Sequence, residues 1–305
     1  MTDTAAGIEW PKKTRELYHN HFDSTIWNDF PFRDDDIIIG TYAKSGTTWL
    51  QQVVSQLIFK GAEGVNNAEL SPWMEMMLPP KEVKLPQVEA QTHRRFLKTH
   101  LPVDALAYSP KAKYIYIARD GRDVAWSYYN HWANMTPEFY GMLNDMRPDG
   151  TEALFPPDME VRDYFLRWLD RDGYPLWSFW ENIASWWAIR DLPNMLLLHF
   201  NTLKADLPAE IKRIAKFLDI EVEDALWDDI GTHCSFDYMK AHAENAVPLG
   251  GQPWKGGAKT FINKGTNGRW HDILSGEDCA RYEAMAIDKL GPDCAHWLAT
   301  GDLPY

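Results

Sequence analysis

The sequence predicts an α/β fold, a single domain in which helices flank a central parallel sheet. Short apolar runs, which are typical of buried strands, occur at 36–39, 94–102, 113–118 and 194–200. Stretches with an apolar face at helical spacing alternate with these runs, as expected for a parallel sheet. Neither repeats nor a linker-like tract interrupt the sequence. Residues 1–305 are therefore expected to form one domain.

Composition excludes several classes of partner. The formal net charge is −13, so a general nucleic-acid or anionic-membrane partner is not expected, and any anion site must be a local basic patch. The three cysteines form no Cys-x-x-Cys pair, which suits a reducing cytoplasm. No apolar leader, membrane-length run or metal-ligand cluster is visible. We expect a cytoplasmic protein without a metal.

The first strand leads through a tight turn into a helix over 49–58, whose apolar residues lie on one face. Such a turn aims several backbone N–H groups and the positive end of the helix dipole at one point, which favours an anion. Lys44 adds a full charge, and the hydroxyls of Ser45, Thr47 and Thr48 add further donors. The turn is therefore predicted to bind an anionic group.

This turn is not a Walker A motif, because Lys44 precedes Gly46 instead of following a glycine. The string 44–49, Lys-Ser-Gly-Thr-Thr-Trp, closely resembles the phosphosulfate-binding loop of cytosolic sulfotransferases. These enzymes use 3′-phosphoadenosine-5′-phosphosulfate (PAPS). Ala43 stands where the family usually has Pro, which makes the turn less rigid but removes no donor. The resemblance implies a P-loop-nucleotide-kinase-like sulfotransferase fold.

The run at 94–102 reads as a strand closed by Pro102, and strand ends are where α/β proteins place their chemistry. Its end, Lys-Thr-His-Leu-Pro, resembles the family segment whose histidine is the catalytic base. The resemblance implies that His100 deprotonates the acceptor, with Lys98 and Thr99 beside it.

The segment 71–77 contains a Trp and three Met residues between polar, Pro-rich stretches. Such clusters are usually core, yet this one also suits the wall of a substrate pocket. It resembles the family's Pro-aromatic-Glu segment at the acceptor site. That resemblance implies acceptor contacts from Trp73, Met74 and Met77.

The strand at 113–118 runs into another helical pattern, so Arg119 at the strand end and Ser127 on the helix can converge. An Arg fork with a hydroxyl is a good clamp for a dianion. The pair resembles the family's 3′-phosphate motif. A later Gly-rich stretch, 261–270, resembles the loop that closes on the same phosphate. Asn263 replaces a family Arg there and Arg269 replaces an Asp, so one phosphate contact is in doubt.

Other segments complete the predicted organisation. Residues 1–33 are an N-terminal lead-in with a helix over 16–22, and 177–190 and 208–218 are further helices. The stretch 136–172 is partly loop-like, rich in Pro and Gly, and longer than its family counterpart. We expect it to be a lid or an acceptor-site insertion. Ser275 is expected to cap a last helix that ends at Gly291.

The resemblance implies sulfuryl transfer from PAPS to a hydroxyl of a small acceptor, a phenol or apolar alcohol, with an amine as another option. His100 would be the base, and Lys44 would stabilise the leaving group. Phe200 replaces a Tyr that contacts the adenine in the family. The residues implied in donor binding are Lys44, Ser45, Gly46, Thr47, Thr48, Trp49, Arg119, Ser127, Phe200, Cys234, Ser235, Phe236, Phe261, Ile262, Asn263, Lys264 and Gly265.

Two alternatives stay open at this stage. A P-loop nucleotide kinase would have the same kind of α/β fold, but it needs a Gly-Lys turn that is missing here. A non-catalytic nucleotide-binding protein would keep the loops and lose the base. The segment after Lys240 does not match the family's dimer motif, so the oligomeric state, a homodimer included, is open.

Overall fold

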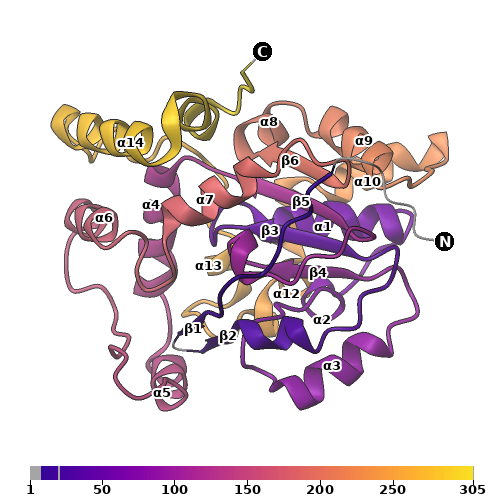
Figure 1. Ribbon diagram of the computed structural model, residues 1–305, viewed down its shortest axis with the longest axis horizontal. Helices are drawn as coiled ribbons and strands as arrows, with labels where there is room; N and C mark the ends of the chain where they lie inside the picture. Colours follow the sequence, from indigo (N-terminus) through magenta and orange to yellow (C-terminus); the bar gives the residue numbers. More distant parts are fainter. Residues whose placement is uncertain (1–7, 20, 305) are drawn as a thin grey trace.

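The computed structural model describes residues 8–19 and 21–304. A four-stranded parallel sheet lies at the centre, in the order β4-β3-β5-β6, with helices on both faces (Figure 1). This is the predicted α/β fold. Strands β4, β5 and β6 lie within predicted runs, whereas β3 begins in the run 36–39 and continues to Thr41. The strands are β3 (Ile37–Thr41), β4 (Phe96–Thr99), β5 (Lys113–Ala118) and β6 (Met195–His199).

The sheet is covered on both faces because side chains alternate along each strand. Ile37 and Ile39 pack into one apolar cluster, whereas Ile38 packs into the other. Two groups of helices contribute buried residues to these clusters. The first cluster includes residues of α1 (Thr47–Ile58), α9 (Leu207–Phe217) and α10 (Trp227–His233). The second includes residues of α4 (Gly121–Ala133), α6 (Val161–Asp170), α7 (Phe179–Ala188) and α14 (Gly276–Thr300).

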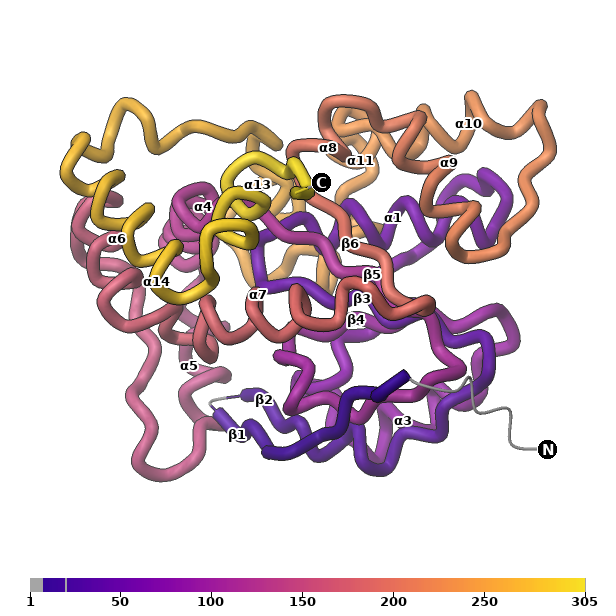
Figure 2. Tube along the Cα trace, turned by 45° about the horizontal axis from the view of Figure 1, so that its top comes forward, coloured from indigo at the N-terminus to yellow at the C-terminus, as the bar shows by residue number. Residues whose placement is uncertain are grey.

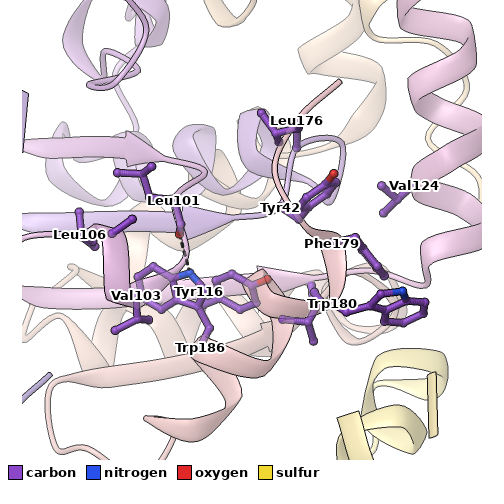
Figure 3. Packing of buried hydrophobic residues seen from close by; sticks show 14 of the residues in the cluster. Tyr42, Leu101, Val103, Leu106, Tyr116, Val124, Leu176, Phe179, Trp180 and Trp186 are labelled. Atoms are coloured by element: carbon purple, nitrogen blue, oxygen red, sulfur yellow. Dashed lines mark hydrogen bonds between the residues drawn. The ribbon is translucent and has the colours of Figure 1, made fainter. Parts of the chain in front are cut away.

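Trp186 of α7 joins this helix to the sheet close to the strand ends (Figure 3). Its ring stacks on Tyr116 with centroids 5.0 Å apart, and its Nε1 donates to the Leu101 carbonyl at 3.0 Å. A Cβ at Gly40 would come within 2.6 Å of this ring, so only glycine fits beneath it. The contact fixes α7 beside the segment that carries His100.

The N-terminal region departs from the sequence prediction. The predicted helix over 16–22 is wrong, because these residues include β1 (Tyr18–His19) and the start of β2 (Phe22–Asp23), which pair antiparallel. Backbone hydrogen bonds to another segment explain the difference: Asp23 N donates to Glu75 O at 2.7 Å, and Met77 N donates to His21 O at 2.8 Å. These bonds to a distant segment override a local helical pattern.

The stretch 136–172 is more helical than its Pro and Gly content suggests. It contains α5 (Pro137–Asp145), capped by Thr136, and α6, joined by a connection over 146–160. Figures 1 and 2 place α5 and α6 at the same edge of the molecule, away from α9 and α10. Arg162 of α6 pairs with Asp278 of α14 at 2.8 Å. The stretch is therefore anchored to the domain at one end.

The last helix begins as predicted, since Ser275 forms a capping box with Asp278. It does not end at Gly291, which only breaks it with a φ of 75°, and helical structure resumes as far as Thr300. In the described part of the chain, no helix is long and apolar enough to cross a membrane.

Short elements complete the chain. They are η1 (Ser24–Asn28), α2 (Asn67–Leu70), α3 (Lys81–Glu89), η2 (Val103–Ala105), α8 (Phe200–Ala205), η3 (Asp224–Leu226), α11 (Phe236–Ala241), α12 (Ala243–Ala246), η4 (Pro248–Gly251) and α13 (Ala258–Phe261).

Candidate active site

A cavity of about 960 Å³ opens at the carboxyl ends of the parallel strands. The β3–α1 loop lines it, as do His100 after β4, Arg119 after β5 and Phe200 after β6. Strands that run in parallel end at one edge of the sheet, so four segments distant in the sequence meet there. The cavity is the candidate active site.

The β3–α1 loop presents an anion-binding surface to the cavity. Lys44 and Gly46 adopt positive φ values of 71° and 110°, which turn the chain sharply into α1. Gly46 is the N-cap and supplies no side-chain hydrogen bond to the helix. The first amides of α1 therefore retain their donors for an anion. The anion site that the sequence predicts for this turn stays a prediction, and these amides are free to serve it.

Lys44 extends from this loop into the cavity. Its Nζ lies 3.2 Å from Nδ1 of His131 and 4.1 Å from the centre of the Phe261 ring. Burial lowers the pKa of Lys44 to about 7, and the nearby charges of Lys98 and Arg119 add to this effect. The ammonium lies in a cation-rich pocket, where a bound anion would stabilise its charged form.

His100 is held in one orientation at the end of β4. Its Nδ1 lies 2.8 Å from the Thr41 carbonyl and 2.9 Å from Oγ1 of Thr41. The carbonyl can only accept, so Nδ1 carries the proton and Nε2 keeps its lone pair. Burial lowers the pKa of His100 well below its ordinary value, and Lys98 lowers it further. A neutral imidazole with a free lone pair can act as a general base.

Glu75 orders the residues around this histidine. It is buried and accepts hydrogen bonds from His100 N at 2.5 Å, Trp73 Nε1 at 2.6 Å and Thr99 Oγ1 at 3.1 Å. Burial raises the pKa of Glu75, while these donors oppose the rise. The Trp73 and His100 rings meet edge to face with centroids 4.5 Å apart. Trp73 and His100 therefore form one supported wall.

Arg119 joins the strand end to the late Gly-rich loop. Its Nε donates to Asn267 Oδ1 at 2.9 Å, and its Nη2 donates to the Thr266 carbonyl at 3.0 Å. Asp123 accepts from Gly268 N at 2.9 Å and holds the same loop. Since Ser127 also lines the cavity, the two residues of the predicted dianion clamp face one space.

Arg269 stands at the opposite end of this loop from Asn263 and turns back toward it. Its Nη1 donates to Asn263 Oδ1 at 2.9 Å, and its guanidinium lies 3.5 Å from the centre of the Trp126 ring. Arg269 lines the cavity together with Arg119. The Arg269 guanidinium thus lies next to Asn263, the residue that stands where the family has an Arg.

Most residues singled out from the sequence line the cavity. They are Lys44, Gly46, Thr47, Thr48, Trp49, Trp73, Lys98, His100, Arg119, Ser127, Phe200, Phe236, Phe261, Ile262, Asn263, Lys264 and Gly265. Their roles stay predictions, since their position shows only that a ligand in the cavity can reach them.

Six predicted site residues are not among the residues that line the cavity: Ser45, Met74, Met77, Thr99, Cys234 and Ser235. Ser45, Met74 and Cys234 are fully buried. Thr99 turns toward Glu75, and the Ser235 side chain caps α11. In the 73–77 segment, which turns at residues 74–75, Met76 lines the cavity in place of Met74 and Met77.

The sequence analysis missed most of the apolar end of the cavity. Its lining comes from separate segments and includes His21, Phe22, Met76, Leu78, Pro79, Met135, Phe139, Met142, Leu143, Leu154, Pro175 and Trp254. No motif joins these residues in the sequence. His131 was also missed, although it lies four residues after Ser127. Among the described residues, no group of three or more His, Cys, Asp or Glu side chains is placed to hold a metal ion.

A sulfotransferase-domain family model matches residues 34–291. The chain belongs to the sulfotransferase family. This sulfotransferase is 28% identical to a glycolipid sulfotransferase of Mycobacterium tuberculosis, over 97% of this chain and 98% of the relative. It is 31% identical to sulfotransferase 1A1 of Rattus norvegicus, over 85% of this chain and 86% of the relative.

Solved structures agree with this assignment. Retinol dehydratase in a complex with retinol and PAP aligns with a TM-score of 0.67 and 26% identity, covering 87% of this chain and 84% of that one. A mouse sulfotransferase complexed with PAP aligns with a TM-score of 0.69, covering 90% of this chain and 92% of that one. At 23% identity, the mouse structure supports the fold alone.

Proposed function

We propose that this sulfotransferase moves the sulfuryl group of PAPS onto the hydroxyl of an apolar alcohol or phenol, with His100 as general base and Lys44 stabilising the leaving group. The single observation that carries the proposal is the placement of His100. Its Nδ1 is tied to Thr41, and its ring lines the same cavity as Lys44. A base and a cation thus face one space at the strand ends.

The donor end of the cavity fits a nucleotide with several negative charges. Lys44 and the start of α1 line it together with Arg119, Lys264 and Arg269, and Arg119 Nη1 donates to the Lys44 carbonyl at 3.3 Å. Flat apolar surfaces for a base are also present, since Trp49, Phe200 and Phe236 line the same end. Charge-assisted bonds from two arginines favour a nucleotide with a 3′-phosphate, as in PAPS, over ATP. Retinol dehydratase, which was solved with retinol and PAP, supports this donor.

His100 and Lys44 act at different atoms of the reaction, the acceptor oxygen and the leaving oxygen. The Nε2 atom of His100 takes the proton as the acceptor oxygen bonds to sulfur. The bond between sulfur and the bridging oxygen breaks, and its electron pair stays on the nucleotide's 5′-phosphate. Lys44 stabilises the negative charge that develops on that oxygen. Lys98, whose Nζ lies 4.5 Å from the Trp73 ring centre, lines the cavity beside this centre.

Most of the side chains that line the acceptor end are apolar. Methionine, aromatic and proline side chains from five segments line it, and methionine adapts to irregular ligands. Retinol and glycolipids, which appear in the names of a neighbour and a relative, are apolar alcohols or carry apolar chains. An apolar acceptor would displace water from this surface at a favourable free energy. We therefore rank apolar alcohols above polar acceptors.

The test is a turnover assay with PAPS and a panel of apolar alcohols, phenols and amines, with ATP as the competing donor. We expect sulfated product from PAPS and at least one apolar acceptor, and no phosphoryl transfer from ATP. Calorimetry with PAP and ATP would separate this function from that of a nucleotide kinase, and the turnover assay would separate an enzyme from a binding protein. Tight PAP binding without turnover on any acceptor would contradict the proposal.

A further inference from the structure

His131 is a second histidine beside the proposed transfer centre, and none of the roles above uses it. It lies on α4, one helical turn beyond Ser127, and lines the same cavity as His100. Its Nδ1 is 3.2 Å from Nζ of Lys44, which is hydrogen-bonding distance. The two proposed catalytic groups therefore have a third, unassigned neighbour.

Lys44 depends on this neighbour because its other surroundings are poor in acceptors. Within the described ranges, no carboxylate forms an ion pair with its Nζ, and Nδ1 of His131 is the one side-chain acceptor that Nζ reaches. The charges that act on the ammonium are Lys98 at the end of β4 and Arg119 at the end of β5, and both are cations. Nδ1 of His131 thus supplies the stabilising contact.

His131 is suited to accept this hydrogen bond. Its ring packs among the Trp132, Trp254 and Phe261 rings, with centroids 5.3, 5.1 and 5.9 Å away. Burial lowers the pKa of His131 well below its ordinary value, and Lys44, Lys98 and His21 add to the effect. The imidazole is therefore neutral. Its Nδ1 lone pair receives an N–H of Lys44, which leaves the proton on Nε2.

We propose that His131 is a positioning residue for Lys44. It accepts one N–H of the ammonium, stabilises its charged form and leaves the other two N–H groups free for the donor. The inference rests on the proposed function, because Lys44 matters in this way only if it stabilises the leaving group. An ammonium has three donors, so one can stay on His131 while two contact an anion.

The test compares three variants. His131→Phe keeps an aromatic ring but removes the acceptor, and His131→Asn places an amide oxygen near the position of Nδ1. Trp132→Phe is the matched control, because it alters packing beside His131 without touching the Lys44 contact. His131→Leu replaces His131→Phe if the latter does not fold. In every variant the other ionisable groups facing the pair, Lys98, His100, Arg119 and His21, stay in place.

The first readout is kcat/KM for PAPS against pH, which reports ionisations of the free enzyme. Its alkaline limb marks the loss of the Lys44 charge. Without the acceptor the charged form loses a hydrogen bond, so in His131→Phe this limb moves to lower pH by about one unit. His131→Asn and Trp132→Phe keep the wild-type limb.

The second readout is the rate of Lys44 acetylation against pH, followed by peptide mass spectrometry, which needs no turnover. It should show the same shift in His131→Phe and the same rescue in His131→Asn. An unmoved pH dependence in His131→Phe would overturn the proposal. So would a shift of equal size in His131→Asn, because accepting a hydrogen bond would then not be the function. A wild-type protein without turnover counts against the proposed function, whereas the acetylation profile still decides the role of His131.

Discussion

The two ends of the cavity are built in different ways. The donor end is made of the turns that directly follow β3, β5 and β6, together with Phe236 and the 261–269 loop. Its contacts are mostly hydrogen bonds and charges, such as those from Arg119 to the Thr266 carbonyl and the Asn267 side chain. The acceptor end is made of side chains from the β1–β2 hairpin, the 71–79 segment, α5 and the 146–160 connection. Its contacts are mostly apolar.

Because of this difference, the two ends should tolerate amino-acid substitutions differently. Charge-assisted hydrogen bonds require specific atoms at specific distances, so a change of one residue at the donor end removes a defined contact. Apolar packing depends on total area and volume, so the acceptor end can change residue by residue while it stays apolar. Substitutions where the two ends meet, at His100 and Lys44, are expected to have the largest effects.

The largest effect is expected for His100. His100→Asn should lower turnover by about 10²–10⁴-fold, the usual loss for a general base, while PAP affinity in calorimetry stays close to that of the wild type. An acidic phenol, already ionised at neutral pH, should suffer least. Equal losses for acidic phenols and aliphatic alcohols would mean that His100 positions the acceptor instead.

The pH profile sharpens this prediction. Because its folded-state pKa is lowered, His100 stays neutral, and able to accept a proton, well below the ordinary histidine range. On the acid side of the profile, activity should therefore fall only below about pH 6.5. An acid limb that begins above that pH would contradict the environment described for His100.

The contrast between the two ends also explains how much the sequence could predict. Local patterns predicted strand β3 and the positions of Lys44, His100 and Arg119. Each of these residues follows shortly after a strand, and an apolar run marks that strand in the sequence. The pairing of β1 with β2 could not be predicted, since the backbone hydrogen-bond partners of this region are Glu75 and Met77. Met76 could not be separated from Met74 and Met77, because only tertiary packing decides which side chain of this segment faces the cavity.

Lys44 should show the second largest effect. Lys44→Ala removes one preorganised charge from the site of the leaving group, which typically costs about 10²–10³ in kcat. PAP binding should weaken less, since the amides at the start of α1 remain. Single-turnover kinetics with saturating PAPS would measure the loss. Near-normal turnover in Lys44→Ala would remove this residue from the mechanism.

Arg119 and Arg269 test whether the donor end recognises a 3′-phosphate. Arg119→Ala should weaken PAP binding by about 10–100-fold, from the loss of a charge-assisted contact. Arg269→Ala should cost less, because its side chain is more exposed. Arg213→Ala on α9 is the control. Calorimetry with AMP, which lacks the 3′-phosphate, should show little change in any of these variants. Equal losses for AMP and PAP would place the arginines elsewhere on the nucleotide.

The smallest effect concerns motion at the acceptor end. The stretch 136–172 lines the cavity through Thr136, Phe139 and Met142 of its first helix and through Leu154 in the connection. Its far end is tied to the domain, as Arg162 pairs with Asp278, whereas the Arg171–Glu152 pair lies within the stretch itself. Phe155, beside Leu154, is 74% exposed, so the connection buries little apolar area on its outer side. A segment with few buried contacts opens at a low free energy.

We therefore predict that hydrogen exchange over 146–160 slows when nucleotide and an apolar acceptor are both bound, because the acceptor adds apolar contacts on the inner side. Amides of α6 should change less, since the ion pair to α14 already holds that helix. PAP alone should protect the 262–269 loop and leave 146–160 nearly unchanged, which separates the two ends of the cavity in one experiment. Equal protection of 146–160 with and without acceptor would show that this connection is a fixed wall and not a lid.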